Sequence, residues 1–359
     1  MFENCLEKAI KGEDLTQEEA YQVVKAMLGG KVVPVRMAAL LTALRIKGAA
    51  YSELLGAALA LKESFEPLAG LENNFLSMDR EEIHLDRETI ERTSLPEDGG
   101  TSTFNVSTAT ALVVAGAGGR VVRHASLIPS EHVGTEHVLK ELGIQPEVTP
   151  SVARRCLEEA GVAFLYSPAL NPSARLLYQV RKQLGLRTLL NVAGPLSNPM
   201  GATFLYLGVY DPSDLSLFCS VAKALGVERG MLVHGEHTLD EASITGATRV
   251  CFLDSSKTHV KELVPEDLGL RRWEPQDIKG GTAQENAHAI KEVLKGTKGA
   301  PRDLVLLNSA LALMACKMAR DEKEGLCMAA ESLDSGAALR SLELLARLSN
   351  EQGYLRRAE

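Results

Sequence analysis

The chain has 359 residues, of which 45% are hydrophobic and 24% are charged. This length and balance exclude a disordered chain and predict about two folded domains. A formal net charge of −8 argues against nucleic acid as a partner, because phosphate backbones are bound by clustered Lys and Arg. The six cysteines are scattered without a CxxC pair, which argues against a structural zinc site.

The first residues lack the basic start and apolar run of a secretion signal. The sequence also contains no uninterrupted apolar stretch of membrane-spanning length. We therefore expect a cytoplasmic protein.

Helices are predicted up to about residue 64. Thr16 and Glu19 are three residues apart before an amphipathic run, which is the spacing of a capping box. Pro34 is expected to open a second helix, since the first turn needs no amide hydrogen there, and Gly48 to close it. A third helix is expected over Tyr51–Ser64, and no strand is evident in this region.

The pattern changes after about residue 75. Ala111–Ala115 and Val121–Val122 flank a glycine-rich stretch, as in a helix that turns into a buried strand. Thr203–Val209 and Met231–Val233 also have the pattern of short buried strands, with helical segments between them. This alternation predicts an α/β domain with a mostly parallel central sheet.

Helical periodicity returns over Asn171–Leu184, and this segment is expected to join the first domain in space. Further helices are expected around Asn308–Ala319 and Gly336–Leu348. The predicted organisation is a small all-helical domain and a large α/β domain. The expected ranges are 1–70 with helices from about 171–190 for the first, and 71–170 with 191–359 for the second.

Small polar residues stand directly before an apolar helical run, at Thr103, Asn105, Ser107 and Thr108. A helix N-terminus presents free backbone N–H groups and a positive dipole end, so these residues are candidates for an anion site. The alternative is an ordinary N-cap, because Ser, Thr and Asn begin many helices.

Two basic clusters are candidates for ligand contacts. Arg123 and His124 directly follow a predicted strand, and ligands of open α/β sheets bind at strand ends. The alternative there is a strand end that is solvated by polar side chains. Arg181 lies on a helical segment, where its guanidinium could pair with a carboxylate or could belong to a solvated helix face.

Asp240 and Glu241 form an acidic pair on a loop after a buried strand. Adjacent carboxylates suit Mg²⁺, which binds a couple of carboxylates together with substrate phosphates. A surface acidic pair is the alternative. His234 and His237 raise a zinc alternative, but no further Cys or His completes such a site.

Taken together, these clusters resemble the anthranilate phosphoribosyltransferase family, which is structurally related to the pyrimidine nucleoside phosphorylases. The similarity runs nearly end to end, through LTQEEAYQVVKAMLGG, VRKQLGLRTLLNVAGPLSNPMGA, LDEASITGAT and GGTAQENA. It implies a homodimer formed through the helical domains. It also implies a reaction in which an amine nucleophile displaces pyrophosphate from phosphoribosyl pyrophosphate, with Mg²⁺ as cofactor.

The resemblance also implies roles for individual residues. Binding of phosphoribosyl pyrophosphate is implied for Thr103, Asn105, Ser107, Thr108, Arg123, Ser130 and Thr135. Binding of a small carboxylate-bearing acceptor is implied for His124, Ser126 and Arg181, of which Arg181 matches the arginine that engages the carboxylate of anthranilate. Binding of Mg²⁺ is implied for Ser107, Asp240 and Glu241.

Four segments depart from the family pattern. Leu95–Gly99 stands where the family has Gly-Thr-Gly-Gly-Asp, so that Pro96 removes an amide donor and Glu97 and Asp98 add negative charge beside a polyanion. Ala125–Leu127 replaces Gly-Asn-Arg of the family. Glu131–His132 replaces Ser-Lys, and Asn171–Pro172 replaces His-Pro.

Two hypotheses follow. The first is an active phosphoribosyltransferase, with an aromatic or amine acceptor that differs from anthranilate. The second is a catalytically impaired paralogue that acts as a small-molecule or nucleic-acid binding protein. The altered loop at 95–99 favours the second. Six retained polar residues are difficult to explain by packing and favour the first; they are Asn105, Ser107, Thr108, Arg181, Asp240 and Glu241.

Overall fold

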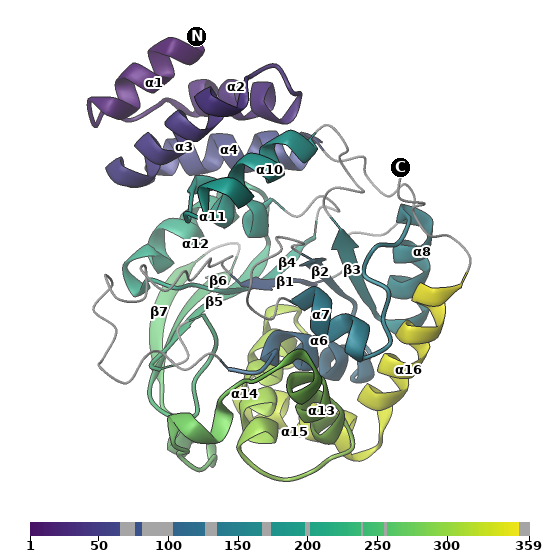
Figure 1. Ribbon diagram of the computed structural model, residues 1–359. Helices are drawn as coiled ribbons and strands as arrows, with labels where there is room; N and C mark the ends of the chain where they lie inside the picture. Colours follow the sequence, from purple (N-terminus) through teal and green to yellow (C-terminus); the bar gives the residue numbers. More distant parts are fainter. Residues whose placement is uncertain are drawn as a thin grey trace.

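The computed structural model describes residues 1–64, 76–80, 103–125, 135–166, 174–197, 202–237, 240–254 and 257–351. A layer of helices lies at one end of the molecule, beside a sheet that carries further helices on both faces (Figure 1). Within the described ranges, no helix is long and apolar enough to span a membrane.

Four helices form the N-terminal layer: α1 (Phe2–Ile10), α2 (Gln17–Leu28), α3 (Pro34–Lys47) and α4 (Tyr51–Ser64). The predicted capping box is confirmed, because the Thr16 side chain accepts from Glu19 N and the Glu19 side chain accepts from Thr16 N. Pro34 opens α3 as expected. Gly48 ends it with φ 88°, a left-handed backbone angle that favours glycine.

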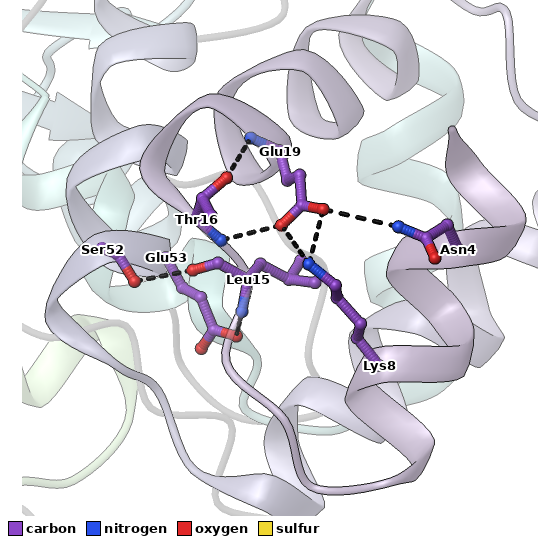
Figure 2. Close-up of polar contacts among 7 residues, drawn as sticks. All are labelled: Asn4, Lys8, Leu15, Thr16, Glu19, Ser52 and Glu53. Carbon is purple, nitrogen blue, oxygen red and sulfur yellow. Dashed lines mark hydrogen bonds and ion pairs between the residues drawn. The ribbon is translucent and has the colours of Figure 1, made fainter.

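Polar contacts join α1, α2 and α4 (Figure 2). Lys8 on α1 donates to Glu19 Oε1 at 2.7 Å, so that the capping carboxylate of α2 also forms an ion pair. The fully buried Glu53 of α4 accepts from Leu15 N at 2.9 Å, and Ser52 Oγ donates to Leu15 O at 2.6 Å. The turn before α2 is therefore held against α4 through both the N–H and the C=O group of Leu15.

A seven-stranded sheet forms the centre of the molecule, in the order β3-β2-β1-β4-β5-β6-β7. Neighbours from β3 to β5 are parallel, whereas β5–β6 and β6–β7 are antiparallel, which confirms the predicted mostly parallel sheet. The strands are β1 (Leu76–Arg80), β2 (Val121–Ala125), β3 (Val162–Tyr166), β4 (Phe204–Gly208), β5 (Arg229–Gly235), β6 (Thr248–Asp254) and β7 (Thr258–Leu263).

Alternation along the central strands explains why both faces of the sheet are covered. Phe204 and Tyr206 of β4 belong to one buried cluster, and Leu205 and Leu207 belong to the other. The first cluster packs on α6 (Val106–Gly116), α13 (Ala283–Leu294), α14 (Ala300–Ala315), α15 (Glu322–Asp334) and α16 (Ala337–Asn350). The second packs on α1–α4, α10 (Arg175–Leu184), α11 (Leu189–Leu196) and α12 (Leu215–Ala224).

The later helices differ in part from their predicted bounds. α14 begins at Ala300 and ends at Ala315, whereas a helix was predicted around Asn308–Ala319. Pro301 occupies its first turn, and Lys317 with φ 62° lies beyond its end, which accounts for both shifts. α10 lies inside the predicted helical segment and packs against α3, and the domain boundaries themselves stay a prediction.

Candidate functional site

The N-terminus of α6 carries several of the predicted polar residues. Asn105 is the N-cap residue and is only 6% exposed, and Thr108 in the first turn is fully buried. Ser107 between them is half-buried. In this turn the N–H groups of Val106 and Thr108 bond to Phe104 O and Asn105 O. The anion site at this helix N-terminus stays a prediction.

The acidic pair lies against the carboxyl end of β4. Gly208 is the last residue of that strand, and a Cβ atom there would overlap the carbonyl oxygen of Asp240. Glu241 is 2% exposed, and its Oε2 accepts from Thr103 Oγ1 at 2.9 Å. The structure therefore brings together Thr103 and Glu241, which are 138 residues apart, and shows that Glu241 is not part of a surface acidic pair.

A third segment, from Lys279 to Asn286, completes this cluster. Thr103 forms an isolated antiparallel bridge with Lys279, and a Cβ atom on Gly280 would lie 2.7 Å from Thr103 O. Asn286 on α13 donates from Nδ2 to Asn105 Oδ1 at 3.2 Å and accepts from Gly281 N at 2.8 Å. Sequence reasoning assigned no role to Asn286. The available signal was a polar residue on the buried face of an amphipathic helix.

Arg123 is a buried link between three elements, not a solvated strand end. The residue is 3% exposed, and its Nε donates to Met78 O of β1 at 3.2 Å. Nη1 donates to Thr108 Oγ1 at 2.9 Å, which connects β2 to the first turn of α6. Arg123 is thus joined directly to one of the predicted phosphate-binding residues.

The remaining predicted residues are less closely tied to this cluster. The backbone of His124 pairs with Leu165 of β3, and Thr135 is a half-buried residue at the start of α7 (Thr135–Glu141). Ser126 and Ser130 lie outside the described residues, as do the altered segments 95–99, 126–127, 131–132 and 171–172.

Arg181 lies on α10, among the helices that pack on the other cluster of the core. Only 6% of the residue is exposed, and its guanidinium lies 5.9 Å from the centre of the Tyr178 ring. Lys182, the next residue, is exposed. Arg181 is therefore not part of a solvated helix face, and its contact with an acceptor carboxylate stays a prediction.

Burial shapes the protonation of one group beside the acidic pair. Burial raises the pKa of the Tyr206 phenol well above its ordinary value, and the nearby Glu241 carboxylate raises it further. The phenol therefore stays protonated and donates from its hydroxyl to Asn308 Oδ1 at 2.6 Å.

The donor set of the cluster fits Mg²⁺ better than zinc. Thr103, Asn105 and Glu241 of this cluster carry oxygen atoms, as do the predicted ligands Ser107 and Asp240, and oxygen ligands suit Mg²⁺. Among the described residues, no three His, Cys, Asp or Glu side chains converge into a complete metal site. This set of oxygen donors is compatible with Mg²⁺, which proteins bind through a couple of carboxylates together with substrate phosphates.

Two domain models of one protein family match most of the chain. The model of the glycosyl transferase family α/β domain matches residues 98–339, and that of the helical bundle domain of the same family matches residues 3–65. The chain is 40% identical to the anthranilate phosphoribosyltransferase of Geotalea uraniireducens (strain Rf4) over 351 residues, which cover 98% of this chain and 100% of that protein.

Solved structures agree with this match. The crystal structure of anthranilate phosphoribosyltransferase from Thermus thermophilus aligns with a TM-score of 0.84 and 34% identity, covering 96% of this chain and 99% of that one. The Saccharomyces cerevisiae anthranilate phosphoribosyltransferase in complex with PRPP and Mg shares the fold, with a TM-score of 0.80, 24% identity and 97% coverage of both chains.

Proposed function

Because the chain belongs to the anthranilate phosphoribosyltransferase family, we propose that it transfers the phosphoribosyl group of phosphoribosyl pyrophosphate to anthranilate and releases pyrophosphate. The hydrogen bond between Thr103 and Glu241 carries this proposal, because it joins the candidate phosphate-binding and metal-binding segments. The comparisons with known proteins give no support to the alternative of an impaired paralogue. The match over the full length of the relatives also favours anthranilate over a changed acceptor.

The reaction exchanges one bond at the anomeric carbon of the ribose. The amine nitrogen of the acceptor bonds to that carbon while the bond from the carbon to the pyrophosphate oxygen breaks, and the amine then loses a proton. An aromatic amine is already a nucleophile, so the protein needs little general-base assistance. Its main task is to position both substrates and to stabilise the charge that develops on the leaving group.

Each part of the site has a role in this proposal. Thr103, Asn105, Ser107 and Thr108 bind the phosphates at the N-terminus of α6, and Arg123 holds Thr108 in place. Ser107, Asp240 and Glu241 would hold Mg²⁺, which when bound neutralises negative charge on the pyrophosphate. Contacts of Arg123, Ser130 and Thr135 with phosphoribosyl pyrophosphate, and of His124, Ser126 and Arg181 with the acceptor, are part of the same proposal.

Turnover by the purified chain tests this function. Pyrophosphate release should require phosphoribosyl pyrophosphate, anthranilate and Mg²⁺ together, and should fall to background when any one is omitted. Aniline in place of anthranilate should support little release, because it lacks the carboxylate. Calorimetric binding of phosphoribosyl pyrophosphate without turnover of anthranilate would instead favour the impaired paralogue or another acceptor.

We also propose that two copies of the chain associate through α3. Val35 is 74% exposed and Ile46 is 82% exposed, and they are 11 residues apart, about three helical turns, so both lie on one face of the helix. Exposed Ala39 lies between them on this face. An apolar stripe of this kind is suited to an isologous contact, in which the same patch meets itself.

Replacing Val35 and Ile46 together with Glu should convert the dimer to a monomer, because it places like charges across a self-complementary contact. Light scattering coupled to size exclusion measures the mass. The matched control is Val260→Glu, which changes a 54% exposed valine on β7 and should leave the dimer intact. A monomeric parent chain, or a double variant that remains dimeric, would refute the proposed contact.

A further inference from the structure

We infer that Asn308, a buried asparagine on α14, is a positioning residue that holds the acidic pair in its working geometry. The inference rests on the proposed function, because it takes Asp240 and Glu241 as the groups that act on Mg²⁺ and pyrophosphate. Asn308 itself lies against the loop that carries Asp240 and Glu241, and makes no contact with substrate in this proposal. It acts through the backbone of Ala242, the residue after Glu241.

The side-chain amide of Asn308 uses its full hydrogen-bonding capacity. Its Oδ1 accepts from Ala242 N at 3.0 Å and from the Tyr206 hydroxyl at 2.6 Å. Its Nδ2 donates to Ala242 O at 2.9 Å and to Leu304 O at 2.9 Å. An amide offers two acceptor positions and two donors, so all four are satisfied in a residue that is 2% exposed.

Two of these hydrogen bonds are made to the same loop residue, Ala242. Asn308 binds both the N–H and the C=O of Ala242, as a neighbouring β-strand would. On the other side of the acidic pair, the Asp240 carbonyl lies against Gly208 at a distance that leaves no room for a Cβ atom. The backbone is thus fixed immediately before and after Glu241, and the Glu241 carboxylate is directed to Thr103.

The surroundings show that this arrangement is specific to Asn308. The helix around it is apolar, and a buried amide there is unfavourable unless its hydrogen bonds are made. The next residue, Ser309, is equally buried, yet its hydroxyl has no hydrogen-bond partner among the described residues. A buried polar side chain on this helix therefore does not by itself bind the Ala242 backbone, and Ser309 offers a matched control for Asn308.

The only tryptophan of the chain provides a direct signal from this loop. Trp273 N donates to Ile244 O at 3.0 Å, three residues after Glu241. Its indole Nε1 donates to Asp303 Oδ2 of α14 at 2.9 Å. The fluorescence of Trp273 therefore reports how the loop sits against the helix that carries Asn308, without requiring turnover.

The experiment compares Asn308→Asp, Tyr206→Phe and Ser309→Ala with the parent chain. Asn308→Asp keeps the acceptor but loses both donors, and should raise the Mg²⁺ concentration for half-maximal fluorescence change, with phosphoribosyl pyrophosphate present, by about tenfold. It should lower kcat by a similar factor while the KM for anthranilate changes by less than about twofold. Tyr206→Phe removes only the supporting hydroxyl and should show a rise of roughly threefold. Ser309→Ala should match the parent.

The possible outcomes separate positioning from simple stabilisation. If Asn308→Asp lowers the melting temperature but leaves the Mg²⁺ response and kcat unchanged at a temperature where every variant is folded, Asn308 is only structural and the inference fails. If Asn308→Asp does not fold, Tyr206→Phe decides, and an unchanged Mg²⁺ response overturns the inference. A parent chain that responds to neither Mg²⁺ nor phosphoribosyl pyrophosphate contradicts the proposed function itself.

Discussion

Replacing Asp240 with Asn and Glu241 with Gln together should lower kcat by about 1000-fold or more, because electrostatic stabilisation of a leaving group supplies several kcal/mol. Both substitutions keep the size of the side chain and remove only its negative charge. Glu241→Gln still offers an oxygen to Thr103 Oγ1, so the fold of the loop should survive. The double variant should also lose Mg²⁺-dependent binding of phosphoribosyl pyrophosphate, which calorimetry measures.

The chain supplies a matched control for this experiment. Glu158 and Glu159 are also adjacent carboxylates, but they lie in the short helix Cys156–Ala160, are 39% and 46% exposed and pair with Arg154 and Arg155. Changing both to Gln alters the net charge by the same amount and should leave Mg²⁺ binding and kcat unchanged. The assignment fails if the Asp240/Glu241 variant binds phosphoribosyl pyrophosphate with Mg²⁺ as tightly as the parent.

Local signals in the sequence were enough to predict the elements that begin or end at distinctive residues. The capping box at Thr16, the proline that opens α3 and the glycine that closes it all act within a few residues, so their structural consequence is visible in the sequence itself. The bounds of α14 could not be predicted in this way. Its residues are apolar almost throughout, so that periodicity marks neither end.

The sheet was predicted as mostly parallel, but no strand was predicted at β1, β3, β6 or β7. β6 is largely buried, with the pattern of an ordinary central strand, whereas β7 is exposed along nearly its whole length. Whether a strand runs parallel or antiparallel to its neighbour depends on the connection between them, which composition does not reveal. The hairpin became evident only from the pairing of the two strands.

Some residues of the candidate site could be predicted from the sequence and others could not. Thr103, Asn105 and Glu241 were predicted from residue type and from the family resemblance, and the structure connects them. Asn286 and Asn308 were missed because they act through neighbours that are distant in sequence, at separations of 181 and 66 residues. A buried asparagine in an apolar helix is visible in the sequence, but its partners become known only when the fold brings them together.

Arg181→Ala should raise the KM for anthranilate by roughly 30- to 1000-fold, because removing one partner of a buried charge pair costs about 2–4 kcal/mol. Binding of phosphoribosyl pyrophosphate should stay within about twofold of the parent value, since Arg181 lies on α10 and the phosphate-binding residues lie at α6. Arg181→Lys keeps the charge but loses the planar fork, so its KM should fall between those of the parent and the alanine variant.

Two controls make the role of Arg181 decidable. Lys182→Ala removes the adjacent but exposed cation and should leave KM unchanged, because an exposed charge contributes little. Inhibition by benzoate, which has the carboxylate, and by aniline, which lacks it, separates the contact from general packing. The parent should prefer benzoate, and Arg181→Ala should lose that preference. If the variant weakens benzoate, aniline and phosphoribosyl pyrophosphate equally, Arg181 supports the fold of α10 through its contact with Tyr178, and the acceptor carboxylate is bound elsewhere.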